Sequence, residues 1–81
     1  GLADPYIERG ISYQRLGDHQ LAIEDFDKAI ELDPDADSYC IRGDSHRLLG
    51  QNERAMEDYD KAIELDPDNA EDYSQLKMRV V

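Results

Sequence analysis

The stretch "DKAIELDPD" occupies residues 27–35 and returns unchanged at residues 60–68 of this 81-residue chain. When the sequence is compared with itself at a shift of 33 residues, 18 of the 30 positions from Tyr6 to Asp35 are identical to their counterparts. A fixed internal period is typical of repeat architectures, in which each unit buries its apolar surface by stacking on the next. The sequence therefore predicts two units built alike.

The first half of each unit has the spacing of a helix. In unit one, Tyr6, Gly10 and Tyr13 follow the i, i+4, i+7 pattern of one helical face. Pro5 suits the first turn, where its missing N–H would lack a partner anyway. We expect Asp4 to cap this turn with its carboxylate.

The second half of each unit is predicted to be another helix. Gly17 ends the first helix, and Asp18 is a candidate cap for the second. Pro34 cannot continue a helix, so the second helix should end just before it. Its apolar stripe consists of Ala22, Phe26, Ala29 and Ile30. No sustained alternation of apolar and polar residues supports a strand.

The end of the chain carries a fifth predicted helix, over residues 70–81. Tyr73, Leu76 and Val80 follow the i, i+3, i+7 spacing of a helical face. Lys77 stands where the two units have Gly10 and Gly43. A lysine there leaves no room for close approach of a further helix, so we expect this segment to cap the array.

Two features of the units predict how their helices pack. Gly10 lowers helix propensity by up to about 1 kcal/mol relative to alanine, which suggests a close helix approach with small Ala22 opposite. Arg9 precedes Asp25 by 16 residues, and Arg42 precedes Asp58 by the same 16. In antiparallel helices these side chains could meet, so we predict a partly buried, bidentate ion pair in each unit.

Eight aromatic, small or proline positions recur at fixed offsets in both units. They are Tyr6, Gly10, Tyr13, Gly17, Ala22, Phe26, Ala29 and Pro34, then Tyr39, Gly43, His46, Gly50, Ala55, Tyr59, Ala62 and Pro67. This pattern resembles the tetratricopeptide repeat family. The departures are a tyrosine in place of the usual first tryptophan, a histidine at position 46, and a period one residue shorter than the usual 34.

The resemblance implies one all-α domain over residues 1–81, an α-α superhelix of five antiparallel helices. Repeat one would cover residues 3–35, repeat two residues 36–68, and a C-terminal capping helix residues 70–81. The family's stacked repeats create a concave face lined mainly by the first helix of each unit, and partner proteins bind there.

The formal charge of −11, from 9 basic and 20 acidic side chains, limits the partners. Such a surface repels phosphates, so we expect neither nucleic acid nor a membrane as partner. It favours a partner with basic side chains, although solubility alone would also explain the charge. No apolar run reaches the roughly 20 residues that span a bilayer. With no leader and a single cysteine, Cys40, we expect a cytoplasmic location.

Catalysis and metal binding find little support in the sequence. His19, His46 and Cys40 are the candidates for nucleophile and base, but His46 lies on the packing face of its helix and is better explained as a core residue. No Gly-rich phosphate loop and no metal-ligand spacing occur. We therefore expect no catalytic residues, no cofactor and no metal.

Binding on the concave face is the function that remains. Residues that directly follow the packing positions of each first helix (Tyr6, Gly10 and Tyr13 in unit one) should point into that face. They are Ile7, Ile11 and Gln14, then Cys40, Asp44 and Arg47, then Ser74, Met78 and Val81. Apolar members suggest apolar side chains on a partner, and Asp44, with Asp4, Asp37 and Glu71 at the rim, suggests basic ones.

Two alternatives qualify this site. Ile7 and Ile11 could instead pack against an upstream helix, and Met78 and Val81 could mark a self-association surface. One subset of the family holds peptides that end in a free carboxylate, using basic and Asn side chains. The matching positions here are Ile7, Ile11, Ile41, Glu71 and Gln75, none of them basic. An acidic C-terminal peptide is therefore excluded as the expected ligand.

The predicted function is a scaffold or adaptor module that captures an apolar and basic peptide or protein without catalysis. The alternative is a structural segment that stacks on further repeats or forms a homo-oligomer.

Overall fold

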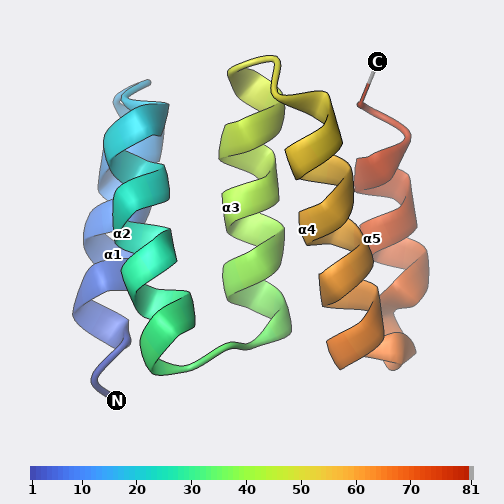
Figure 1. Cartoon of the computed structure of the whole chain (residues 1–81), viewed down its shortest axis with the longest axis horizontal. Coiled ribbons are helices and arrows are strands. Elements are labelled where there is room, and N and C mark those ends of the chain that lie inside the picture. Colours follow the sequence, from blue (N-terminus) through green and yellow to red (C-terminus); the bar gives the residue numbers. More distant parts are fainter. Residues whose placement is uncertain (81) are drawn as a thin grey trace.

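The chain folds into antiparallel helices. The computed structural model describes residues 1–80, which contain five α-helices, one short 3-10 turn and no strand. In chain order these are α1 (Asp4–Arg15), α2 (His19–Leu32), α3 (Ala36–Leu48), α4 (Asn52–Leu65), the 3-10 turn η1 (Pro67–Asn69) and α5 (Ala70–Lys77). Successive helices run in opposite directions (Figure 1). The prediction of an all-α repeat fold with five antiparallel helices is confirmed.

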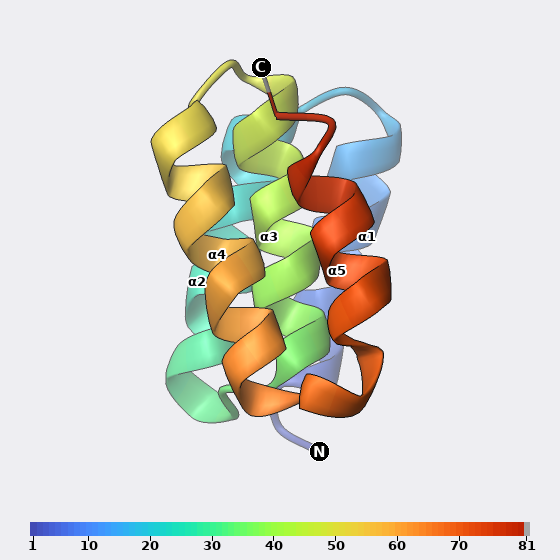
Figure 2. The same cartoon turned by 90° about the vertical axis from the view of Figure 1, so that its right-hand side faces the viewer.

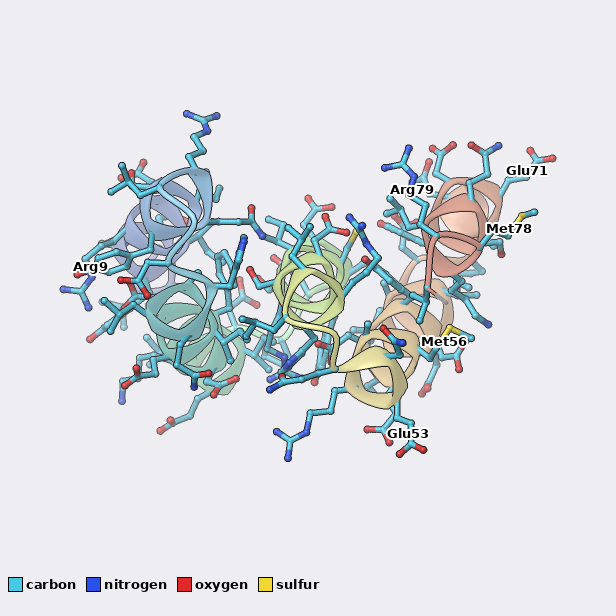
Figure 3. The ribbon with its side chains drawn as sticks, turned by 90° about the horizontal axis from the view of Figure 1, so that it is seen from above. Arg9, Glu53, Met56, Glu71, Met78 and Arg79 are labelled. Carbon is cyan, nitrogen blue, oxygen red and sulfur yellow. The ribbon has the colours of Figure 1, made fainter. Side chains whose placement is uncertain are left out.

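The helices form two layers. Helices α2 and α4 lie on one side, whereas α1 and α5 lie on the other, with α3 set back between them (Figures 2 and 3). The first helices of the units, α1 and α3, therefore form a curved row with α5. We call the surface of this row the first-helix face.

Glycine makes the turn inside each unit. Gly17 and Gly50 have φ of +84° and +79°, in the left-handed region that glycine adopts without strain. After α1, the N–H of Asp18 donates to the carbonyl of Tyr13 at 2.9 Å and that of Gly17 to Gln14 at 3.0 Å. This is the Schellman pattern, and it recurs after α3, so the predicted end of each first helix is confirmed.

Aspartate caps two of the helices but not the first. The N–H of Leu21 donates to the Asp18 carboxylate at 3.4 Å, as predicted, and the N–H of Ser38 donates to Asp35 at 2.8 Å. The prediction that Asp4 caps α1 is wrong: the capping residue is Ala3, without a side-chain bond. Ala3 is buried and its carbonyl accepts the N–H of residue 7, so the first turn begins one residue early and takes Asp4 into the helix.

The predicted apolar stripes form the core. Ala22, Phe26 and Ala29 of α2 are 0% exposed, and so are their counterparts Ala55, Tyr59 and Ala62 of α4. Burial of these side chains between the layers is the main stabilising contribution of the fold.

Phe26, not Ala22, lies against the backbone of Gly10. A Cβ atom added at Gly10 would lie 2.5 Å from Cε1 of Phe26, and one at Gly43 would lie 3.0 Å from Cε1 of Tyr59. Gly10 thus leaves room for a neighbour on the facing helix, but that neighbour is the ring of Phe26, whereas the sequence predicted a close helix approach at small Ala22. The large ring fills the space that the absent side chain leaves, because buried atoms pack without voids.

Both predicted ion pairs form and are bidentate. Arg9 donates from Nε and Nη2 to Asp25 at 2.9 and 2.6 Å, and Arg42 donates to Asp58 with the same two distances. Both carboxylates are buried, at 5% and 4% exposed. These pairs join the two helices of each unit.

The last helix is shorter than predicted. Helix α5 ends at Lys77, and the N–H groups of Arg79 and Val80 donate three residues back in 3-10 fashion. Met78 is 83% exposed, so no tertiary packing supports a further α-helical turn there. Lys77 donates to Asp60 at 2.5 Å, which ties α5 to α4. Val81 lies outside the described residues.

Candidate functional site

Ile7 and Cys40 of the predicted row meet at a recess between α1 and α3. It has a volume of about 300 Å³, at the small end of ligand pockets. It is lined by Asp4 and Ile7 of α1, by Asp37, Ser38, Cys40 and Ile41 of α3, and by the capping residue Asp35. We call it the α1–α3 recess. It lies where the N-terminal ends of the two helices run side by side.

Cys40 contributes an apolar surface to this recess. It packs against a buried cluster of Ala36, Ala62 and Tyr73. Burial, followed by the nearby charge of Asp44, raises the pKa of the Cys40 thiol to about 12. The thiol is therefore protonated at neutral pH and behaves as a small apolar group, not as a nucleophile.

Asp44 and Arg47 are held by a tyrosine of the second layer. The hydroxyl of Tyr59 donates to the carboxylate of Asp44 in a short hydrogen bond and accepts from Nε of Arg47 at 3.4 Å. Burial, followed by the hydrogen bond to Asp44, raises the pKa of Tyr59. Both predicted site residues are thus half-buried and held by contacts within the protein.

The side chain of Gln14 connects the two units by hydrogen bonds and is not available to a partner as predicted. Its amide nitrogen donates to the backbone carbonyl of Ile41 at 3.1 Å and to the hydroxyl of Ser45 at 2.9 Å. Ser45 is fully buried. This bridge fixes the spacing of α1 and α3 beside the recess, so Gln14 has a structural contact where the sequence predicted a partner contact.

The other predicted residues are spread along the first-helix face. Ile11 is half-buried one turn beyond Ile7 on α1, and Ser74 is exposed on α5. Met78 follows the end of α5 and points away from α3 (Figure 3). The structure therefore does not bring Met78 together with the recess, because Met78 lies at the C-terminal end of α5, whereas the recess lies at the N-terminal ends of α1 and α3, at the opposite end of the helices (Figure 1).

Sequence reasoning missed Asp35 and Ser38 as recess residues. Both lie at the start of α3, and Asp35 belongs to the stretch that is repeated without change. The signal that could have found them is the cap itself, since a capping residue and the residue three positions later, whose N–H donates to it, face the same helix end.

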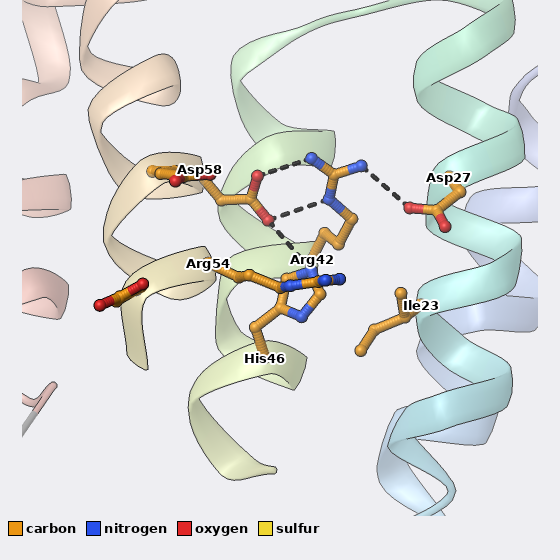
Figure 4. A pocket seen from close by; sticks show the side chains of 8 residues that line it. Ile23, Asp27, Arg42, His46, Arg54 and Asp58 are labelled. Atoms are coloured by element: carbon orange, nitrogen blue, oxygen red, sulfur yellow. Dashed lines mark hydrogen bonds and ion pairs between the residues drawn. The ribbon is translucent and has the colours of Figure 1, made fainter. Parts of the chain in front are cut away.

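A second cavity of about 440 Å³ lies among α2, α3 and α4. Arg42 crosses it, donating from Nη1 to Asp27 of unit one at 2.9 Å as well as to Asp58 (Figure 4). His46 is buried, as predicted, with Nδ1 2.7 Å from Gln51 and Nε2 3.7 Å from Asp58. These internal contacts occupy the charged groups of the cavity floor and join the units.

Two further features of the described residues concern metal binding and membranes. Within residues 1–80, no group of three or more His, Cys, Asp or Glu side chains is arranged to hold a metal ion. None of the described helices has both the length and the apolar character that a bilayer crossing requires.

Comparison with known proteins identifies the repeats. The model of the tetratricopeptide repeat family matches residues 3–35 and again residues 36–69. A search of curated proteins found no significant match. Members of this family are in general non-catalytic modules of protein–protein interaction. Since the two matches cover most of the sequence, the chain belongs to the tetratricopeptide repeat family.

Proposed function

We propose that this chain is a scaffold or adaptor module that binds a segment of a partner protein on its first-helix face and catalyses no reaction. The observation that carries the proposal is the α1–α3 recess, an apolar floor with acidic residues around it on the face that family members use for partners. The predicted partner has apolar and basic side chains.

The apolar part of the partner would contact Ile7, Ile11 and Cys40. All three are half-buried, so each already has part of its surface against the protein and part against solvent. Covering the remaining area of such side chains is favourable by roughly 25 cal/mol per Å² of apolar surface. A partner with one or two aliphatic or aromatic residues would gain this energy without displacing any internal hydrogen bond.

The charge of the chain supports the basic part of the proposal. With a formal charge of −11, the protein attracts cationic segments within the screening length of the solution, which is about 8 Å at physiological ionic strength. Such attraction mainly accelerates association and disfavours acidic competitors. Nucleic acid and anionic membrane surfaces are for the same reason excluded from the proposal.

The test is a selection of peptides from a random library on the 81-residue chain, followed by affinity measurement on variants. We expect Ile11→Glu to weaken the selected peptides at least tenfold. Met56→Glu is the matched control, because Met56 is also half-buried but lies at the outer end of the molecule, on α4 (Figure 3). Equal effects of the two substitutions, or none for Ile11→Glu, would contradict the proposal.

Self-association is the second candidate, favoured by apolar side chains exposed at both ends of the row. Leu2 and Leu16, at the two ends of α1, are 82% and 81% exposed, and Met78 after α5 is 83% exposed. A concentration-dependent dimer in sedimentation equilibrium that Met78→Lys dissociates, combined with no selected peptide, would favour this candidate over partner binding.

A further inference from the structure

The α1–α3 recess combines an apolar floor with a rim of carboxylates. Ile7, Cys40 and Ile41 form its apolar part, and the thiol of Cys40 is neutral at physiological pH because its pKa is raised. A volume of about 300 Å³ accommodates one long side chain but not a folded segment. The occupant must therefore be a single side chain with an extended apolar portion.

The carboxylates of the rim differ in how they are engaged. Asp35 uses one oxygen to cap α3 through the N–H of Ser38. The side chain of Asp37 is exposed, and the structure records no hydrogen bond or ion pair of its carboxylate within residues 1–80. Asp4 is also exposed, and the ammonium group of Gly1 lies 2.6 Å from its Oδ2. The three rim carboxylates are therefore engaged to different degrees.

The charge around the recess decides whether a positively or a negatively charged side chain can bind there. Three carboxylates line the recess, while the N-terminal ends of α1 and α3 contribute about half a positive charge each. The carboxylates outweigh the helix ends by about two charges, and by about one when the Gly1 ammonium on Asp4 is also counted, so an anionic side chain is repelled and a cationic one attracted. An apolar side chain alone would leave Asp37 without a partner.

We propose that the recess receives one lysine or arginine side chain of the partner, with its methylene stem on Ile7 and Cys40 and its cationic head between Asp4 and Asp37. This inference rests on the proposed function and specifies the residue that the first-helix face selects. Long basic side chains bury their stems on apolar surface while the charge stays in water, which is the arrangement that this recess permits.

The test uses two small probes, N-acetyl-lysine methylamide and its norleucine equivalent, which has the same stem without the ammonium group. Each is titrated into the ¹⁵N-labelled chain while backbone amide shifts are followed by NMR. We expect the lysine probe to shift the amides of Ile7, Ser38 and Cys40 in a saturable way and the norleucine probe to leave them nearly unchanged.

Paired variants separate local from overall charge. Asp4→Asn with Asp37→Asn should weaken the lysine probe, by about two- to fivefold for each exposed carboxylate removed. Asp68→Asn with Asp72→Asn is the matched control, because these two carboxylates are exposed near the N-terminal end of α5 and the net charge changes equally. The dispersed amide spectrum of each variant verifies that it is folded.

The outcomes distinguish this inference from the proposed function. Equal shifts from both probes, or equal weakening in both paired variants, would overturn the lysine site. Selected peptides that need Ile11 but no basic residue would overturn it as well and leave the proposed function standing. Conversely, a lysine probe that binds as described, while no library peptide binds, would refute the proposed function and leave the recess as a site for free cationic ligands.

Discussion

Substitution of Gly10 by alanine is expected to destabilise the protein, although alanine is the better helix former. The added Cβ atom would lie 2.5 Å from Cε1 and 2.9 Å from Cδ1 of Phe26, about 1 Å inside normal carbon–carbon contact. Phe26 is 0% exposed, so its ring has no free space into which to move. Overpacking of this kind costs about 1–3 kcal/mol.

The gain in helix propensity offsets part of this cost. Replacing glycine by alanine inside a helix contributes up to about 1 kcal/mol, so the net loss in the free energy of unfolding for Gly10→Ala should be about 1–2 kcal/mol. For a domain of this size, that corresponds to a fall in Tm of about 5–15 °C. Thermal unfolding followed by circular dichroism measures it.

Gly43→Ala in unit two is the matched comparison. There the nearest atom, Cε1 of Tyr59, lies 3.0 Å from the added Cβ, so a shift of a few tenths of an ångström relieves the contact. We expect a change within about 1 kcal/mol of zero. Phe26→Leu should be less harmful in the Gly10→Ala background than alone, because the two sites share one contact. A stabilised Gly10→Ala protein, or strictly additive effects, would refute the packing argument.

Three further predictions concern the ion pairs, the turns and the thiol. Asp58→Asn should lower the free energy of unfolding by about 2–3 kcal/mol in urea titrations, because its partner Arg42 is only partly exposed. Asp25→Asn should lower the same free energy by clearly less, and equal losses would contradict this reasoning. Gly17→Ala should cost about 1–2 kcal/mol in the same titrations, since φ is +84° there, and a neutral effect would argue against the left-handed turn. Cys40 should react with iodoacetamide far more slowly at pH 8 in the folded protein than in urea, because its pKa is raised from 9.0 to about 12, and equal rates would contradict its burial.

The raised pKa of the thiol has a consequence for stability. A folded state that holds the proton more tightly than the unfolded state is stabilised fully below the unfolded pKa, near 9, and loses this contribution as pH rises to about 12. Tyr73, whose pKa burial and then a hydrogen bond to Asp66 raise to about 12, acts in the same direction above pH 10. Alkaline conditions should therefore lower Tm.

The helix boundaries were predictable because local chemistry decides them. Gly17 and Pro34 end their helices through backbone geometry alone, and the same holds at the equivalent turns of unit two. The Arg–Asp pairs were predictable because the 16-residue separation recurs in both units. The exceptions are the start of α1, which depends on the burial of Ala3 in the folded structure, and the end of α5, where exposed Met78 provides no packing for a further turn.

The packing and the site were only partly predictable. Spacing put Gly10 on the right face of α1 but could not tell whether Ala22 or Phe26 lies opposite, which depends on the relative height of the two helices. It put Asp44 on the first-helix face but could not foresee that the hydroxyl of Tyr59 reaches it from the second layer. Contacts between residues distant in sequence require the fold itself.

Binding of a partner segment on the first-helix face at the α1–α3 recess would change the surroundings of the backbone amides there. The most direct measurement is a map of backbone amide shifts in the ¹⁵N-labelled chain at saturation with a selected peptide. We expect the largest shifts at Ile7, Ile11, Ser38 and Cys40, with α2 and α4 little changed. Shifts confined to α2 and α4 would contradict it.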